Sequence, residues 1–194
     1  EDSMKKYRGR FPEPDPYEGG SYRAQKHPRA AFAAMISRMD RDIGRLMKLL
    51  KDLNLDDNTL VIFTSDNGTC FSGGNDPEFF NSSGPLRGIK QDLYEGGIRV
   101  PMIARWPGRI EAGAVSVHIS ALWDVMPTFA ELVSVQTPPN IDGISMLPTL
   151  LGQPEKQKQH KYLYWEWNNK GGRQAIRMGK WKGIRQNLLR KQGD

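Results

Sequence analysis

The amino-acid sequence predicts an α/β fold that ends in a small antiparallel sheet. A long amphipathic helix is predicted over residues 28–53, and a buried strand follows it at residues 60–64. A helix that leads directly into such a strand is half of a βαβ unit. Further on, short segments with alternating apolar residues fill residues 162–184, as in antiparallel strands. We therefore expect an α/β domain over residues 1–155 and a segment of antiparallel strands over residues 156–194.

Length and composition limit the possible classes of protein. The chain has 194 residues, which is enough for one domain with a hydrophobic core. Its formal net charge is +6, a balance that suits anionic glycans, nucleic acids or membrane surfaces. The positive charges are dense only at residues 5–10 and 170–191, and such runs are usually solvated surface. No apolar stretch approaches the roughly 18 residues of a membrane helix. The single cysteine, Cys70, excludes an internal disulfide.

The chain begins with a polar segment and then a clear helix. Residues 1–27 are rich in proline, glycine and charge, which predicts an irregular lead-in on the surface. Through residues 28–53, apolar side chains recur every three or four positions and form one stripe. Pro28 suits the first turn of this helix. Asp40 and Asp42 lie beside the stripe, and we interpret them as ion-pair partners on the helix surface.

The strand after this helix ends in a polar turn with a functional signal. Residues 60–64 are apolar or β-branched, which predicts a strand buried on both faces, and Ser65-Asp66-Asn67-Gly68 follows at once. In an open parallel α/β sheet, ligands bind just beyond the carboxyl ends of the strands. A carboxylate and an amide oxygen side by side suit calcium or magnesium, so Asp66 and Asn67 are candidate metal ligands. Asp-Asn-Gly is also strong turn chemistry, and a plain turn is the alternative.

A long loop and a second motif come next. Residues 69–88 hold glycine, asparagine, serine and proline with little periodicity, and a loop of this length is usually functional or mobile. The second motif is Gly88-Ile89-Lys90-Gln91-Asp92-Leu93-Tyr94-Glu95-Gly96-Gly97-Ile98-Arg99-Val100-Pro101. Ser-Asp-Asn-Gly followed by Gly-x-Lys-x4-Glu-Gly-Gly-x-Arg-Val-Pro resembles the type I sulfatases, which are arylsulfatase-like enzymes. The flanking residues 39–46 and 124–128 are similar too, and the resemblance covers residues 22–182.

This resemblance implies a fold, an activity and a set of site residues. The implied fold is part of an alkaline-phosphatase-like mixed sheet sandwiched by helices, and residues 156–194 would be the start of a small C-terminal antiparallel subdomain. The activity is hydrolysis of a sulfate ester to an alcohol and inorganic sulfate. By the same resemblance, Asp66 and Asn67 are ligands of calcium, with magnesium possible, and Lys90 is the catalytic residue that contacts the substrate's sulfate group. Glu95, residues 96–97 and Arg99 are expected to shape the backbone rather than to react.

The nucleophile of this family is a formylglycine made from Cys or Ser in a Cys/Ser-x-Pro/Ala-x-Arg motif. Cys70 has no such context, and we interpret it as a loop cysteine. The run Ser83-Gly84-Pro85-Leu86-Arg87 matches the letters but follows the metal strand, so we interpret it as a coincidence. The resemblance therefore implies that the formylglycine and further acidic ligands lie in a preceding part of a longer enzyme. Alone, this chain is expected to bind calcium weakly and to hydrolyse nothing.

Downstream of the second motif, the sequence predicts shorter elements. Pro101 favours a strand start or a sheet edge there. Pro127 interrupts a helical pattern, which predicts a kink or a helix start near Asp124. The histidines His27, His118 and His160 match no motif, and we expect surface or packing roles for them. The predicted elements are a strand at residues 100–106, a helix at 120–133, a helical turn at 142–152 and strands at 162–167, 173–178 and 181–184.

Two other interpretations remain open from the sequence. One is a metal-dependent phosphodiesterase or phosphonate hydrolase of the same superfamily. The other is a non-catalytic basic module for sulfated glycan or nucleic acid, whose affinity would fall steeply with salt and would not need Asp66. Under the sulfatase interpretation, the substrate is a sulfated glycan or an aryl sulfate, with no nucleic-acid partner and no membrane span. The family is typically secreted, periplasmic or lysosomal, while the particular ester and the oligomeric state stay open.

Overall fold

The computed structural model describes residues 2–189, and its contacts divide the chain into two compact units. One unit runs up to Thr59 and includes Asn67–Arg99, and the other holds Leu60–Asp66 and the chain from Val100 onward. The predicted division at residues 155 and 156 stays a prediction. The last residues of the predicted basic run and of the predicted C-terminal subdomain, 190–194, lie outside the described residues.

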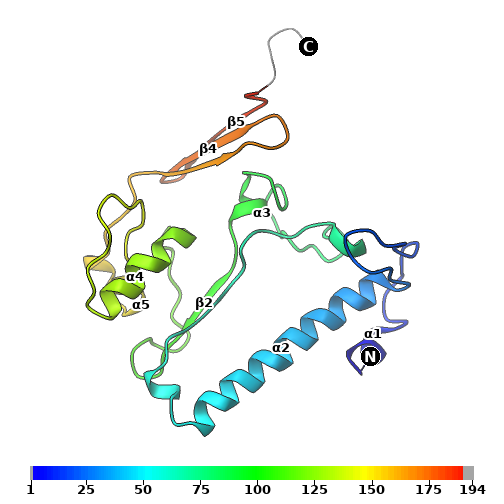
Figure 1. Cartoon of the computed structure of the whole chain (residues 1–194), viewed down its shortest axis with the longest axis horizontal. Coiled ribbons are helices and arrows are strands. Elements are labelled where there is room, and N and C mark those ends of the chain that lie inside the picture. The colour runs from blue at the N-terminus through cyan, green and yellow to red at the C-terminus, as the bar shows by residue number, and fades with distance from the viewer. Residues whose placement is uncertain (1, 190–194) are drawn as a thin grey trace. The chain divides into compact units, whose positions relative to one another are not determined.

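The first unit is built on the long helix that the sequence predicts. Helix α2 spans Pro28–Asp52, with Pro28 in its first turn as expected (Figure 1). The lead-in was expected to be irregular, but Asp2–Tyr7 form helix α1. A six-residue helix is marginal by itself, and here the Tyr7 hydroxyl lies 2.6 Å from the Ser37 hydroxyl of α2. This tertiary contact supports a helix that local sequence does not predict.

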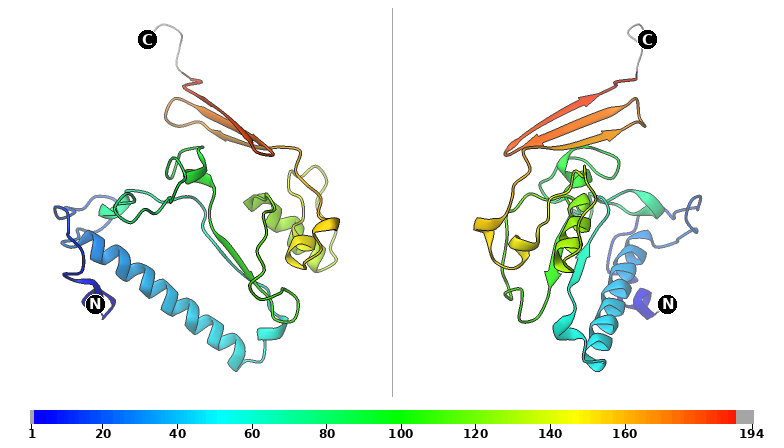
Figure 2. Two further views of the ribbon diagram at one scale, coloured as in Figure 1. Left: turned by 180° about the vertical axis from the view of Figure 1, so that it is seen from behind. Right: turned by 60° about the vertical axis from the view of Figure 1, so that its left-hand side comes forward.

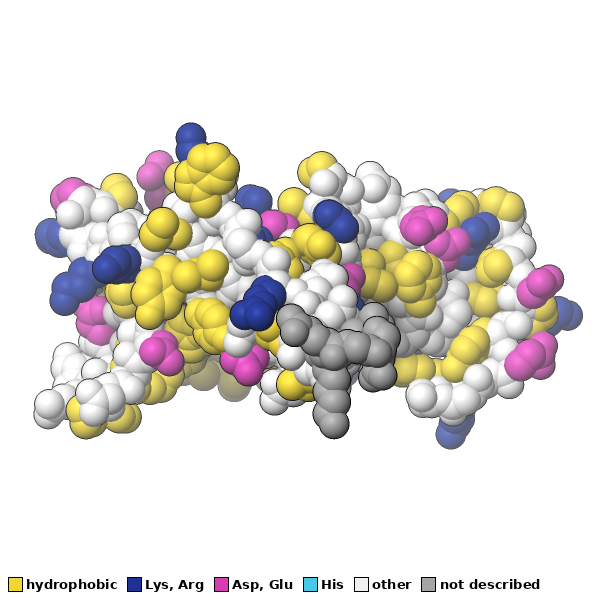
Figure 3. Space-filling view, turned by 90° about the horizontal axis from the view of Figure 1, so that it is seen from above, with side chains coloured by type: hydrophobic (Ala, Val, Ile, Leu, Met, Phe, Trp, Pro, Cys, Tyr) yellow, Lys and Arg dark blue, Asp and Glu magenta, His cyan; other side chains and the backbone are white. Residues whose placement is uncertain are grey.

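The apolar stripe of α2 forms but is only partly covered within the described chain. Ala30 and Ala34 are buried, whereas the side chains of Met35 and Leu46 are each 62% exposed. At the start of the helix, an aromatic cluster supplies the packing: the Phe32 and Phe80 ring centroids are 5.2 Å apart. In the face shown in Figure 3, hydrophobic side chains likewise lie open among charged ones. Short 3-10 turns at Asp56–Asn58 and Ser72–Gly74 and helix α3, Glu95–Ile98, complete this unit.

In the second unit, strands β1 (Val61–Thr64) and β2 (Met102–Arg105) pair in antiparallel fashion (Figure 1). The expectation that the first of these strands is buried on both faces is wrong for the described chain, because Phe63 is 38% exposed. The physical reason is that a ribbon of two strands leaves faces and outer edges open, and β1 and β2 are the only strands of their sheet in residues 2–189. The apolar composition of residues 60–64 therefore predicted the strand correctly but did not predict how far it is buried.

The second unit contains a helical segment that includes the buried residue Asp124. A 3-10 turn at Leu122–Asp124 leads into helix α4, Val125–Leu132, so the predicted helix start near Asp124 is confirmed. Pro127 sits in the first turn of α4, where its missing N–H costs no helical hydrogen bond. Helix α5, Leu147–Leu150, and a 3-10 turn at Pro154–Lys156 follow.

The C-terminal strands form the antiparallel sheet that the alternation predicts. The order is β3-β4-β5, with β3 at Leu163–Trp167, β4 at Arg173–Met178 and β5 at Trp181–Gln186 (Figure 2). Leu163 and Ala175 are the buried hydrophobic residues of this sheet. None of the helices described in the structure is long and apolar enough to cross a membrane.

Candidate functional site

The two predicted metal ligands lie immediately after β1. The strand ends at Thr64, and Asp66 and Asn67 form the bend that follows. The Asp66 side chain is exposed, and Asn67 is half-buried. The structure therefore shows a bend at the carboxyl end of the strand, and the roles of Asp66 and Asn67 as metal ligands stay predictions.

Directly after this bend, the backbone is fixed by glycines that tolerate no side chain. The Gly68 N–H donates a hydrogen bond of 2.9 Å to the Gly97 carbonyl, and the Gly96 N–H donates one of 2.8 Å to the Arg87 carbonyl. A Cβ on Gly68 would collide with the Gly96 carbonyl oxygen. Because the obstacles are backbone atoms, no rotamer change relieves them. We call Gly68, Gly88, Gly96 and Gly97 the glycine cluster.

The glycine cluster explains the double glycine of the second motif. Gly96 and Gly97 are buried, and a Cβ on either would meet a carbonyl oxygen of the segment from Gly88 to Asp92. Their predicted structural role is thus confirmed. Glu95 opens α3, and its carbonyl accepts a 2.7 Å hydrogen bond from the Arg99 N–H. This backbone hydrogen bond between Arg99 and Glu95 agrees with the expectation that the two residues shape the backbone.

Lys90 stands at the corner of a tight turn. Its backbone N–H donates to the Thr69 carbonyl at 2.7 Å, and the Asp92 N–H donates to the Ile89 carbonyl at 2.8 Å. The Lys90 residue is exposed. The structure therefore joins the backbone of Lys90 to a residue only two positions after Asn67.

The donor atoms near the bend fit a hard cation only as a partial set. Asp66 and Asn67 offer carboxylate and amide oxygens, which are the ligand types that calcium and magnesium prefer. Within residues 2–189, the structure holds no group of three or more His, Cys, Asp and Glu side chains placed to hold a metal ion. Calcium takes about six to eight oxygen ligands, so these two residues would supply a minority of them.

Two residues that resemble nucleophiles make hydrogen bonds within the loop, Cys70 through its backbone and Ser83 through its hydroxyl. Cys70 is half-buried, and its carbonyl accepts a 2.6 Å hydrogen bond from the Asn75 side-chain amide. The Ser83 hydroxyl donates to the Gly88 carbonyl at 3.3 Å. Both therefore belong to the loop scaffold around the second motif.

The sequence did not reveal a buried carboxylate–histidine pair in the second unit. Asp124 has no exposed surface, and its carboxylate oxygens lie 2.9 and 3.0 Å from Nε2 of His160. The same carboxylate accepts hydrogen bonds of 2.8 Å from the backbone N–H groups of Ala121 and Ile144. The packing role expected for His160 is thus confirmed. Burial lowers the pKa of nearby His118, and the neighbouring Asp124 charge opposes that shift.

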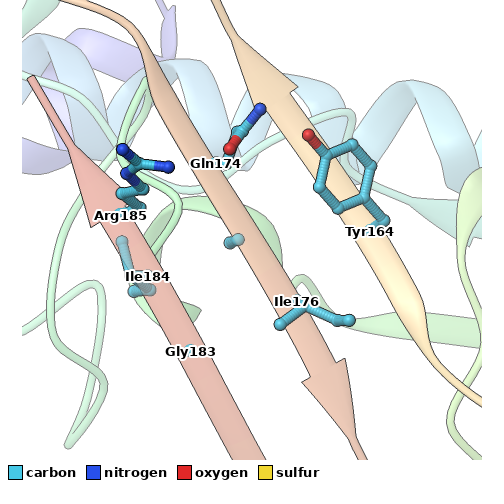
Figure 4. A pocket seen from close by; sticks show the side chains of 7 residues that line it. Tyr164, Gln174, Ile176, Gly183, Ile184 and Arg185 are labelled. Atoms are coloured by element: carbon cyan, nitrogen blue, oxygen red, sulfur yellow. The ribbon is translucent and has the colours of Figure 1, made fainter. Parts of the chain in front are cut away.

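A separate hollow lies on one face of the C-terminal sheet (Figure 4). It has a volume of about 340 Å³ and is lined by side chains such as Tyr164, Gln174, Ile176 and Arg185. The Tyr164 hydroxyl donates to Glu166 at 2.7 Å, which raises the pKa of the tyrosine. This hollow contains none of the predicted site residues, so it is distinct in composition from the bend after β1.

Fold and site together define an α/β protein with oxygen donors directly after a strand and a lysine turn whose backbone is bonded to Thr69. The sequence profile of the sulfatase family matches residues 4–135, and this chain belongs to that family. A second profile, for the C-terminal region of N-sulphoglucosamine sulphohydrolase, matches residues 89–188.

Individual relatives agree with this assignment. The chain is 36% identical over 160 residues to human N-acetylgalactosamine-6-sulfatase, covering 73% of this chain and 30% of the relative. It is 36% identical over 173 residues to human arylsulfatase A, covering 86% of this chain and 32% of the relative. The crystal structure of Ps i-CgsB in complex with k-i-k-neocarrahexaose is similar, with a TM-score of 0.76 and 32% identity over 96% of this chain and 37% of that one. This likeness confirms the predicted fold class, and the chain spans about a third of the length of these relatives.

Proposed function

We propose that this chain contributes to a sulfatase that hydrolyses a sulfate ester to an alcohol and inorganic sulfate. In this proposal, Lys90 binds the sulfate group of the substrate, and Asp66 and Asn67 are two of the ligands of a calcium ion, or of magnesium in its place. The observation that carries the proposal is the backbone hydrogen bond from Lys90 to Thr69, because it ties the lysine turn to the segment of the oxygen donors. Family membership supports the type of reaction.

Each side chain has a chemical task that its type suits. The Lys90 ammonium is a compact charge with three donors, which matches the anionic oxygens of a sulfate group. Asp66 and Asn67 offer acceptor oxygens and no positive charge, as a cation site requires. A bound calcium ion supplies positive charge that stabilises negative charge on sulfate oxygens. The nucleophile is proposed to be a formylglycine, for which neither Cys70 nor Ser83 is the source, because both lie after β1.

The substrate is proposed to be a sulfated glycan or an aryl sulfate. N-acetylgalactosamine-6-sulfatase and arylsulfatase A, to which the chain is similar, carry these two substrate types in their names. A secreted, periplasmic or lysosomal location would agree with family membership. On the face shown in Figure 3, lysine and arginine side chains are dispersed among acidic ones, so this face does not favour a basic binding module.

Activity of the protein made from the complete gene tests the proposal. We would measure cleavage of an aryl sulfate in the presence of calcium by the wild type, Asp66→Ala and Lys90→Ala. Loss of a charge-assisted hydrogen bond costs about 1.5–3 kcal/mol, so we expect Lys90→Ala to lower kcat/KM roughly 10- to 150-fold. We expect Asp66→Ala to weaken calcium binding in calorimetry and to lower activity at limiting calcium, because it removes one oxygen ligand.

Matched controls come from the exposed surface of α2. Asp42→Ala and Lys48→Ala remove the same residue types from surface ion pairs, which contribute little to stability. Both controls are expected to keep wild-type activity and calcium affinity. Full activity in Asp66→Ala and Lys90→Ala would refute the site assignment. A wild type that cleaves phosphodiesters but not sulfate esters would refute the sulfatase proposal and favour the phosphodiesterase.

A further inference from the structure

We propose that Asp92 is a positioning residue that holds Lys90 in the orientation needed to bind the sulfate group. This inference rests on the proposed function, since it takes Lys90 as the sulfate-binding residue. It assigns to Asp92 a task that acts through its neighbour, with no contact to the substrate. The structure carries the inference in the hydrogen bonds that Asp92 makes around the lysine turn.

Asp92 closes the turn with two different groups. Its backbone N–H donates to the Ile89 carbonyl at 2.8 Å, which is the bond that defines a four-residue turn. Its side-chain Oδ2 accepts a hydrogen bond of 3.1 Å from the Ile89 N–H. Both polar groups of the Ile89 backbone are therefore bonded to Asp92. Lys90 is the first of the two residues enclosed between them.

The turn needs this support because its second central residue is not glycine. Gln91 has a φ of 75°, which lies in the left-handed region that favours glycine. A turn with positive φ at this position is the type that normally carries glycine or asparagine. With glutamine there, the backbone conformation is unfavourable by itself. Hydrogen bonds around the turn are needed to hold it, and the Asp92 carboxylate supplies one.

Asp92 lies close against two members of the glycine cluster, Gly88 and Gly97. A Cβ on Gly88 would lie 3.1 Å from the Asp92 Cβ and 3.3 Å from its Oδ2, and a Cβ on Gly97 would collide with the Asp92 carbonyl. Asp92 is half-buried, whereas Lys90 is exposed. The restraint on the lysine therefore comes through its backbone, whose N–H is bonded to Thr69. A fixed Lys90 backbone fixes the position of its Cα atom, from which the flexible side chain extends to the sulfate group.

Kinetics of the protein made from the complete gene test the role of Asp92 through Lys90. The variants are Asp92→Ala, Asp92→Asn, Lys90→Ala and the double variant Asp92→Ala/Lys90→Ala. Asparagine keeps an oxygen acceptor for the Ile89 N–H but removes the charge, so it is the conservative variant. Losing one well-placed hydrogen bond corresponds to about tenfold, so we expect Asp92→Ala to lower kcat/KM about tenfold. With the acceptor retained, Asp92→Asn should stay within about threefold of the wild type.

The double variant separates a positioning role from a merely structural one. If Asp92 acts through Lys90, Asp92→Ala should change kcat/KM less than about twofold when Lys90 is already alanine. Additive losses in the double variant would overturn the inference, as would equal losses in Asp92→Asn and Asp92→Ala. Asp42→Ala, an exposed carboxylate on α2, is the control and should behave as the wild type. Melting temperatures of all variants identify any loss that comes from unfolding.

Amide hydrogen exchange keeps this test independent of the proposed function. If the wild type has no sulfatase activity, or if Lys90→Ala is fully active, the proposed function fails. The turn can then be judged by exchange at the backbone N–H groups of Ile89 and Lys90. We expect faster exchange at these two groups in Asp92→Ala and wild-type protection in Asp92→Asn. Unchanged exchange in Asp92→Ala would overturn the inference, whatever the enzyme's activity.

Discussion

The substitution Gly96→Ala should destabilise the protein because of where the new methyl group would lie. A Cβ on Gly96 would overlap the Gly88 carbonyl oxygen and stand 2.8 Å from the Arg87 carbonyl oxygen. Overpacking of this kind costs typically about 1–3 kcal/mol. The displacement would also weaken the Gly96 N–H bond to Arg87, and a hydrogen bond contributes about 1 kcal/mol. We therefore expect a loss of about 2–4 kcal/mol in the free energy of unfolding.

Gly44→Ala provides the matched control, because Gly44 is also a helical glycine. A Cβ there meets no atom within 4 Å. Alanine is favoured over glycine inside a helix by roughly 0.5–1 kcal/mol, so this variant should be stabilised. Urea unfolding compares the two variants, and hydrogen exchange at the Gly68 and Lys90 N–H groups reports the local effect. Equal stability of Gly96→Ala and wild type, with both amides still protected, would refute the reasoning.

Two further predictions concern the second unit. Asp124→Ala should lower the free energy of unfolding by about 3 kcal/mol or more, measured by urea titration, because it leaves the N–H groups of Ala121 and Ile144 and the His160 ring without their acceptor. Wild-type stability would contradict this. Burial lowers the pKa of His118 in the folded protein below its unfolded value. As the pH falls through the acidic range, the unfolded state therefore takes up the proton more readily, and the folded state loses stability that it has in full above the unfolded pKa. His118→Gln should therefore show a smaller drop in melting temperature between pH 7.5 and pH 5.5, and an unchanged drop would contradict the assignment.

Local patterns were enough to predict the long helix and the C-terminal strands of this chain. The spacing of apolar residues located α2, and Pro28 placed its first turn, because both depend on residues close in sequence. Alternation located β3, β4 and β5, whose partners are neighbours along the chain. Helix α1 was missed because its support, the contact between Tyr7 and Ser37, joins residues far apart in sequence.

For the site, the sequence supplied residue types but not their connections. Asp66, Asn67 and Lys90 were selected by motif, and their roles stay predictions. The hydrogen bond between Lys90 and Thr69 was invisible to sequence reasoning, since it forms across a loop of about twenty residues with little periodicity. The pairing of Asp124 with His160 was missed for the same reason. From sequence alone, a carboxylate such as Asp124 at a helix start is interpreted as an ordinary helix cap. Its distant partner, His160, is seen only in the structure.

The glycine cluster constrains the backbone of the site through close approaches that leave no room for a Cβ. Gly68 lies beside Asn67, and its N–H bond to Gly97 requires two backbones to approach more closely than any Cβ permits. The same close approach sets Gly88 and Gly97 against Asp92, whose carboxylate holds the turn of Lys90. A change at any of these glycines therefore reaches Lys90 through backbone displacement. It follows that substitutions in the glycine cluster should impair the proposed sulfate binding even though none of its members has a side chain to react.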